Sequence, residues 1–351
     1  MAGGARCPVD TMLRLPRVEA VMIRNQPRIV SLLPSCTEII CALGFEDCLV
    51  ARSHECDFPA SVRNLPACTA SKISTTASSA EIDREVKSLL QQALSLYAID
   101  SAMLRELQPD LILTQAQCEV CAVSLTEVEQ AVSEWTGRRP RILSLSPQRL
   151  ADLWENIREV AEALGAARRG RELLQQLKDR VADVIVKTVP LKRRPSVGCL
   201  EWFDPLMAAG NWVPELVELA GGLNLFGEAG KHSPWLNWEA VQEHDPEVLV
   251  LMPCGFDLVR TRTEAATLTR LPDWDKLRAV NPAASSSWMA TSSSTAPARA
   301  SLIRWRCSAR CCIHPSSISA IVAKAGSGSD CESVSGAAEG ATGRSAGGRW
   351  I

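Results

Sequence analysis

A short apolar run that leads directly into a helix-starting turn constrains this chain more than any other segment. Ile29–Leu33 is apolar and bounded by turn residues, which is typical of a buried strand in a parallel sheet. In the Pro-Ser-Cys-Thr turn that follows, Ser35 or Thr37 is placed to cap a helix over Glu38–Leu43, and Gly44 is placed to end it. Ligands of open α/β sheets bind where the strands end. The segment therefore predicts a ligand-binding α/β lobe.

A pattern of helix end, proline, acid and apolar strand occurs twice in the chain. It spans Leu104–Thr114 in the first half and Val241–Leu251 in the second. Each copy follows an earlier strand, a helix and a glycine turn, so the sequence predicts two similar α/β lobes. Between them, Pro147 is placed at the first position of a helix that Gly165 ends, and a second helix runs from about 168 to about 187. Together these helices form a candidate rigid strut between the lobes.

Differences in composition and apolar patterning divide the chain into five segments. We expect a disordered leader at 1–26, the first lobe at 27–146, the linking helices at 147–190, the second lobe at 191–280, and an aberrant tail at 281–351. Ser, Ala and Arg dominate that tail, which contains neither Phe nor Tyr.

Two explanations of the tail are open. One is a disordered segment, as its composition favours. The other is a reading-frame error after about Val280. Read from the third base of each codon, Ala284–Thr291 is compatible with Val-Phe-Val-Val-Asp-Gly-Asn, a plausible strand and turn. On that hypothesis the native end of the second lobe is encoded out of frame, and the four cysteines of the tail carry no evolved chemistry.

Composition excludes several classes of protein. The net charge of -2, without a basic cluster along a helix, gives no reason to expect nucleic-acid binding. No segment approaches 18 uninterrupted apolar residues, so we expect no transmembrane helix. The first 25 residues lack the apolar core of an export signal, which predicts a cytoplasmic protein, or a periplasmic one if the start codon is misplaced. Without an export signal, the 14 cysteines are expected to be reduced thiols.

Two loops of the first lobe carry groups that can ligate metals. Ser53–Phe58 follows an apolar run and contains His54, Glu55 and Cys56. The segment after the strand Leu111–Thr114 contains a Cys-x-x-Cys pair. A structural zinc needs four such ligands, and a single Cys-x-x-Cys supplies two. The alternatives are loops that line a cleft, or a metal- or thiol-dependent site made by these residues: His54, Cys56, Cys118 and Cys121.

Tryptophans mark the predicted loops of the second lobe. Trp202, Trp212 and Trp235 lie after strands or in turns, where they suit a large flat ligand, although a packing role is expected for at least one of them. Trp238 is expected to pack on a helix. The chain lacks the nucleophile elbow, the Walker loop and the dinucleotide fingerprint, so we expect no enzymatic activity.

These motifs together resemble a known family. The strand and turn of Arg28–Glu38, the Leu-Gln-Pro-Asp-Leu-Ile-Leu-Thr segment, the helical middle and the Ala-Gly-Gly-Leu-Asn-Leu-Phe turn are similar to the vitamin B12- and iron-chelate-binding proteins of ABC importers, the class III periplasmic binding proteins. The segments Ser-His-Glu-Cys-Asp-Phe-Pro, Gln-Cys-Glu-Val-Cys, Gly-Asn-Trp-Val-Pro and Gly-Lys-His-Ser-Pro-Trp resemble a cobalamin-binding subgroup. The resemblance covers about Pro27 to Val280.

The resemblance implies two Rossmann-like α/β lobes joined by a long inter-lobe helix, with the ligand in the cleft between them. It implies a monomeric, non-enzymatic substrate-binding protein that moves little on binding, needs no cofactor, and hands cobalamin or a related corrinoid or metal chelate to an ABC permease. A neutral imidazole or a thiolate near the cobalt is chemically possible. The implied ligand-binding residues are Ser35, Cys36, Thr37, His54, Glu55, Cys56, Gln117, Cys118, Trp202, Trp212, Ser233 and Trp235.

Members of the family dock to their permease through an acidic residue on each lobe. Glu239 is the candidate on the second lobe. On the first lobe the chain departs from the pattern, since Ala102 stands where an acid is expected, with Glu106 nearby.

Overall fold

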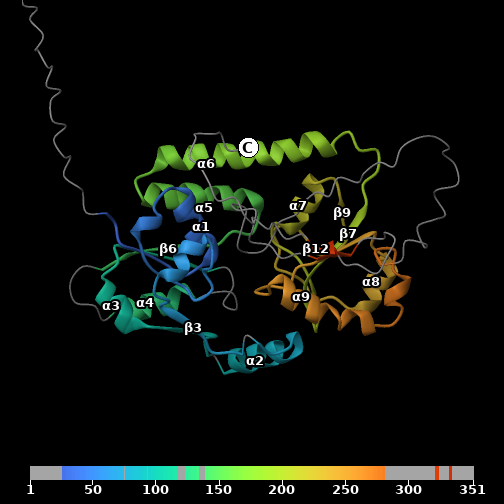
Figure 1. The fold of residues 1–351 in the computed structure, drawn as a ribbon, viewed down its shortest axis with the longest axis horizontal. Helices are drawn as coiled ribbons and strands as arrows, with labels where there is room; N and C mark the ends of the chain where they lie inside the picture. The colour runs from blue at the N-terminus through green and yellow to red at the C-terminus, as the bar shows by residue number, and fades with distance from the viewer. Residues whose placement is uncertain are drawn as a thin grey trace, which may run out of the picture.

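Two α/β lobes lie side by side in the computed structural model, and one long helix runs along both of them (Figure 1). The structure describes residues 26–74, 76–92, 94–116, 123–133 and 139–280, together with two short strands at 321–323 and 332–333. The predicted two-lobed α/β fold is confirmed.

The first lobe is built on a parallel sheet with the strand order β2-β1-β5-β6. Its strands are β1 (Ile29–Ser31), β2 (Leu49–Arg52), β5 (Leu111–Gln115) and β6 (Arg141–Leu145). All residues of β1 and β5 are buried. Alternate side chains enter two separate cores, with Ile29 and Leu111 on one face of the sheet and Val30 and Ile112 on the other. Burial on both faces explains the uninterrupted apolar runs in the sequence.

Helices and a small hairpin surround this sheet. They are α1 (Pro34–Ala42), η1 (Glu46–Cys48), η2 (Ala60–Asn64), β3 (Thr69–Ser71), α2 (Ser79–Gln91), β4 (Tyr97–Ile99), α3 (Ser101–Leu107) and α4 (Leu125–Ser133). The predicted start of α1 is wrong. The helix begins at Pro34, whose fixed φ suits the first helical position, so Ser35 and Thr37 lie inside the helix and neither caps it. Gly44 follows the helix with a φ of 77°, as predicted for its end.

The second lobe has a mixed sheet. The parallel strands are β7 (Ser196–Phe203), β9 (Leu223–Asn224) and β10 (Val248–Leu251), and the antiparallel ones are β8 (Leu206–Ala208), β11 (Ile321–Ala323) and β12 (Glu332–Ser333). The helices are α7 (Val213–Leu219), α8 (Trp238–His244), α9 (Leu258–Ala265), η3 (Leu268–Arg270) and η4 (Trp274–Lys276). Apart from β11 and β12, the tail lies outside the described residues, and so does the leader before Gln26. The frameshift hypothesis stays a prediction.

Two consecutive helices, α5 (Leu150–Ala163) and α6 (Ala167–Thr188), connect the lobes. Helix α5 starts three residues later than predicted, because the Asp152 carboxylate accepts hydrogen bonds from the backbone N–H groups of Gln148 and Arg149 (2.9 and 2.8 Å) and fixes the N-terminus there. Gly170 lets the two helices pack closely, since a Cβ at this position would lie 2.5 Å from that of Ala161.

Helix α6 is fixed to both lobes. Near its start, Arg169 Nη1 donates a hydrogen bond to Leu43 O of the first lobe (3.1 Å). At its end, Thr188 Oγ1 donates one to Leu219 O of the second lobe (3.0 Å). Twenty-two residues of α-helix span about 33 Å. The predicted strut is therefore present, anchored at each end. None of the helices in the described ranges is long and apolar enough to cross a membrane.

Candidate functional site

The carboxyl ends of β1 and β2 carry a buried cluster of hydroxyl and thiol groups. The Thr37 hydroxyl lies 2.8 Å from Ser31 Oγ and 3.0 Å from Cys56 Sγ. All three residues are buried. The structure thus brings together the predicted turn and the predicted His-Glu-Cys loop, which follows β2 as expected. Within the cluster, however, these groups bond to one another, so Thr37 and Cys56 stabilise the corner where the two segments meet.

His54 lies beside this corner and is half-buried. Its Nδ1 is 2.8 Å from Thr69 Oγ1, and its ring centroid is 5.7 Å from that of Tyr97. Thr69 Oγ1 also lies 3.1 Å from Ser53 Oγ and accepts a hydrogen bond from the backbone N–H of His54 (3.1 Å). This network fixes the orientation of the ring.

Cys36 does not line an open surface, contrary to its predicted role in a cleft wall. It belongs to the core between the sheet and α5, with 0% of its surface exposed. Burial, with a smaller contribution from nearby Cys56, raises the pKa of the Cys36 thiol well above its usual range. Because α1 begins at Pro34, Cys36 falls on the inward face of the first turn. Ser35 and Glu55 are half-buried.

In the second lobe, Trp202 lies on a strand and not in a loop as predicted. Strand β7 continues to Phe203 because β8 pairs with it antiparallel, with Trp202 opposite Met207. The Trp202 ring centroid is 5.2 Å from that of Phe256, and its Nε1 donates a hydrogen bond to Ser79 O of the first lobe (3.2 Å). The end of β7 therefore faces the first lobe.

The other two predicted loop tryptophans differ in their surroundings. Trp212 is buried with Val250 and Met252, as expected for a packing residue. Trp235 is 56% exposed, and the ammonium group of Lys87 lies 5.0 Å from its ring centroid. Trp238 packs against Trp274 at the start of α8, as predicted.

Ser233 is buried and holds a turn together. Its hydroxyl donates to Glu201 Oε2 (2.7 Å) and accepts from the backbone N–H of Gly210 (3.1 Å). Glu239 is exposed in the first turn of α8, and Ala102 and Glu106 are exposed on α3.

The predicted Gln117, Cys118 and Cys121 lie outside the described residues. Among the residues that are described, no group of three or more His, Cys, Asp or Glu side chains is placed to hold a metal ion. The metal-site alternative therefore depends on Cys118 and Cys121.

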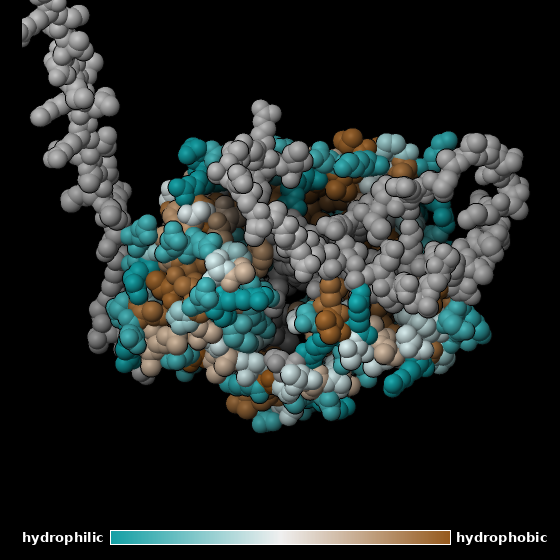
Figure 2. Space-filling model, in the orientation of Figure 1, coloured by the Kyte–Doolittle hydropathy of each residue, from teal (hydrophilic) through white to brown (hydrophobic). Residues whose placement is uncertain are grey.

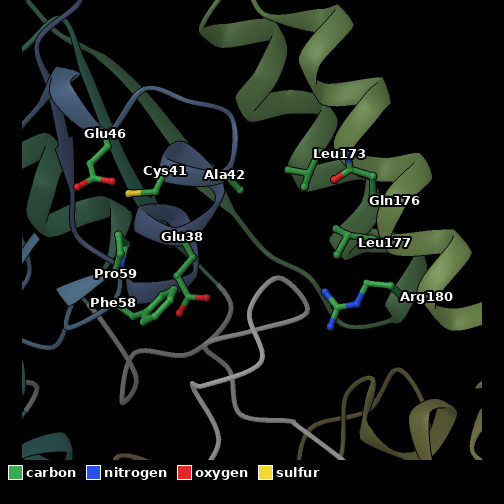
Figure 3. Close-up of a pocket in the computed structure, with 10 residues that line it drawn as sticks. All are labelled: Glu38, Cys41, Ala42, Glu46, Phe58, Pro59, Leu173, Gln176, Leu177 and Arg180. Atoms are coloured by element: carbon green, nitrogen blue, oxygen red, sulfur yellow. The ribbon is translucent and has the colours of Figure 1, made fainter. Parts of the chain in front are cut away.

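A cavity of about 350 Å³ lies between α1 and α6. Figure 3 shows Glu38 and Cys41 of α1 on one side and Leu177 and Arg180 of α6 on the other. Burial, followed by the charges of Glu46 and Glu38, raises the pKa of Cys41 to about 12. The sequence did not single out this cavity, because its walls come from helices far apart in the chain.

Comparisons with known proteins agree with the two-lobed fold. The periplasmic heme-binding protein from Pseudomonas aeruginosa is 21% identical, with a TM-score of 0.53 over 73% of this chain and 81% of that one. An ABC transporter substrate-binding protein from Listeria monocytogenes is 17% identical, with a TM-score of 0.52 over 72% and 85%. The vitamin B12 binding protein BtuF of Vibrio cholerae is 20% identical, with a TM-score of 0.46 over 64% and 75%.

At these identities the two structures with TM-scores above 0.5 establish the shared fold alone. No curated protein matches the sequence. The family model described as periplasmic binding protein matches residues 29–282, which include both lobes and the linking helices. The chain therefore belongs to the periplasmic binding protein family.

Proposed function

We propose that this chain is a non-enzymatic substrate-binding protein that holds cobalamin, or a related corrinoid or metal chelate, between its lobes. The observation that carries the proposal is the hydrogen bond from Trp202 to Ser79, because it brings the strand end of the second lobe up to the first lobe. Ligands of α/β sheets bind outside the carboxyl ends of the strands. We take 27–146 and 191–280 as the two binding lobes and 147–190 as their connection.

The chemistry of the surrounding residues favours a flat chelate. The rings of Trp202 and Phe256 adjoin each other on the second lobe, and Trp235 exposes its indole. Such rings pack well on a large conjugated macrocycle. Among the solved structures of similar fold, one binds heme and another is described as a possible iron-binding protein. The motifs of the His54 loop and of the Trp212 turn add the preference for a corrinoid.

A macrocycle needs the space between the lobes. Pockets for drug-sized ligands measure about 300–1,000 Å³. The cavity between α1 and α6 is a separate site, since the first lobe and the linking helix alone line it. Figure 2 shows the surface hollowed between the two lobes above α2. His54 and Glu55 on the first lobe and Trp202 on the second are the side chains we place around the ligand, with Ser35 beside them.

The state of three buried thiols supports the proposed non-enzymatic role. Cys36, Cys41 and Cys199 have thiol pKa values raised by burial, so they are poor nucleophiles near neutral pH. We propose a periplasmic location and an ABC permease as partner, as for other members of the family. The sequence-based expectation of a cytoplasmic protein gains no support from family membership.

Permease docking would involve Glu239. Ala102 and Glu239 each stand second in a seven-residue helix that ends in a left-handed residue before a proline. The two positions are therefore equivalent, and the first lobe lacks an acid there. Glu106, exposed one turn later on α3, is the substitute we propose.

The test is a titration of the purified full chain with cyanocobalamin, aquocobalamin and hemin, followed by visible absorption and calorimetry. We expect one ligand per chain at micromolar affinity or better. Trp202→Ala should weaken binding at least tenfold, and Trp202→Phe, which keeps a ring, should retain most of it. No binding of these ligands, together with stoichiometric zinc, would instead support the metal- or thiol-dependent alternative.

A further inference from the structure

Helix α2 belongs to the first lobe by sequence and touches the second lobe in space. It is inserted between β3 and β4, and Figure 1 shows it across the gap between the lobes, on the side opposite α6. Its contacts with β7 join residues more than 100 positions apart. The two lobes are thus connected on one side by a covalent helix pair and on the other by a non-covalent contact.

The N-terminus of α2 is clasped by α9. Both the backbone N–H and the hydroxyl of Ser79 donate to Glu264 Oε2 (3.0 and 2.9 Å). Arg260, one turn earlier on α9, donates from Nη2 to Ala77 O (2.5 Å). A carboxylate is favoured at a helix N-terminus, where backbone N–H groups lack partners and the helix dipole is positive. Two side chains on one face of α9 therefore hold the first turn of α2.

An aromatic layer supports this clasp. The guanidinium carbon of Arg260 lies 3.7 Å from the ring centroid of Phe256, and Phe256 packs against Trp202. Trp202 in turn donates its indole hydrogen to Ser79 O. Trp202, which we place against the ligand, thus contacts α2. A movement of α2 would therefore alter the surface that we propose binds the ligand.

Beyond its first turn, α2 is held by the first lobe, since Val86 and Leu89 are half-buried against the core cluster that includes Leu96. Ser79 and Ile82 are the only buried residues in its 13 positions. The Lys87 contact with Trp235 lies at the surface, where such interactions contribute little. The contact of α2 with the second lobe, in contrast, rests on a few polar interactions, and contacts of this kind open far more often than the core.

We propose that α2 is a latch over the mouth of the inter-lobe cleft: it is closed by the Ser79–Glu264 and Ala77–Arg260 contacts, and it opens locally to admit the ligand. This inference rests on the proposed function for the identity of what passes, but the latch itself is a property of the unliganded chain. The latch explains how a ligand can enter although the strut α6 holds the lobes rigidly, since only α2 has to move.

The first experiment measures the latch without ligand, by hydrogen exchange of the full chain. In Glu264→Ala, the amides at the start of α2 should exchange about tenfold faster, as expected for loss of hydrogen bonds to a charged group. The matched control is Glu243→Ala, an exposed acid on α8, which should leave exchange in α2 unchanged. Arg260→Gln, which removes the contact with Ala77, should also speed exchange at the start of α2. Unchanged protection of α2 in both Glu264→Ala and Arg260→Gln would overturn the latch.

The second experiment measures gating by stopped-flow absorption with cyanocobalamin, or with hemin if that ligand binds. Both the association and the dissociation rate constants should rise severalfold in Glu264→Ala. The dissociation constant, which is their ratio, should change less. Faster exchange of α2 with unchanged ligand rates would refute gating. If neither ligand binds, the proposed function fails, and the exchange result still decides whether α2 is a latch.

Discussion

Asp110 and Glu247 occupy equivalent positions in the two lobes, and each carboxylate accepts a hydrogen bond from the backbone at the start of a strand. Asp110 Oδ2 accepts a hydrogen bond from the backbone N–H of Arg28 just before β1 (2.9 Å). Glu247 Oε2 accepts one from the backbone N–H of Ser196 at the start of β7 (3.0 Å). Each acid follows a proline and a left-handed residue that ends a helix. The repeat that divides the chain into two lobes thus extends to single hydrogen bonds.

Asp110→Ala should destabilise the chain by about 0.5–1.5 kcal/mol, because it removes the hydrogen bond that the exposed Arg28 N–H donates to the carboxylate. Urea unfolding followed by circular dichroism gives the free energy of unfolding. Glu106→Ala, an exposed acid on the neighbouring helix α3, is the control and should change the stability by less than about 0.5 kcal/mol. Equal effects of the two substitutions would contradict the structural role of Asp110.

Local patterns were sufficient to predict the two lobes and the linking helices, because each depended on apolar periodicity and turn chemistry within one segment. The end of β7 could not be predicted in this way. Asp204-Pro205 looks like the end of the strand, but it is the turn of a hairpin, and pairing with β8 extends β7 to Phe203. The start of α5 was misplaced for a similar reason, since the Asp152 side chain and not the proline sets it.

The candidate site was less predictable than the fold. The residue types around the turn were found, but the phase of α1 decided that Cys36 is buried while Ser35 is partly exposed. The clasp between Ser79 and Glu264 joins residues 185 positions apart, and no local pattern encodes such a pair. Arg180 was missed for the same reason, because a cavity between α1 and α6 exists only after the lobes are built.

Two glycines with similar backbone angles should differ strongly in their tolerance of alanine. Gly227 has a φ of 74°, and a Cβ there would lie 2.1 Å from Ala209 O. Gly255 has a φ of 77°, and nothing lies within 4 Å of its Cβ position. We expect Gly227→Ala to cost about 3 kcal/mol or more, since strain and a clash add, and Gly255→Ala to cost about 1 kcal/mol from strain alone. Thermal unfolding of both variants measures the difference. Similar melting temperatures would show that the Gly227 turn relaxes around the methyl group.

Thr37→Val separates a structural role for the buried turn from a ligand contact. The substitution keeps the size of the side chain but removes the hydroxyl that bonds to Ser31 and contacts Cys56. We expect a loss of about 1–3 kcal/mol in the free energy of unfolding, with little change in ligand affinity once the protein is folded. Ser35→Ala, on the same helix and half-buried, should lower the ligand affinity and leave the free energy of unfolding nearly unchanged. A large loss of affinity in Thr37→Val at unchanged stability would instead place Thr37 against the ligand.

Burial of thiols makes the stability of the chain sensitive to alkaline pH. Desolvation, followed by the charge of Glu201, raises the pKa of Cys199 from 9.0 to about 12. Between these values the unfolded chain loses a proton that the folded chain keeps, so the stability linked to this group is complete below about pH 9 and is lost as the pH rises toward about 12.

Cys199→Ala removes this dependence. At pH 7 the variant should be less stable than the native chain, because packing is lost. Between pH 9 and pH 11 the native chain should lose up to about 1.4 kcal/mol per pH unit more than the variant, so the two stabilities converge. Val217→Ala is the control, since Val217 lies in the same apolar cluster and does not titrate, and its cost should be constant with pH. Urea unfolding of all three proteins at several pH values measures these differences. A constant difference between the native chain and Cys199→Ala from pH 7 to pH 11 would mean that water reaches Cys199 in the folded state.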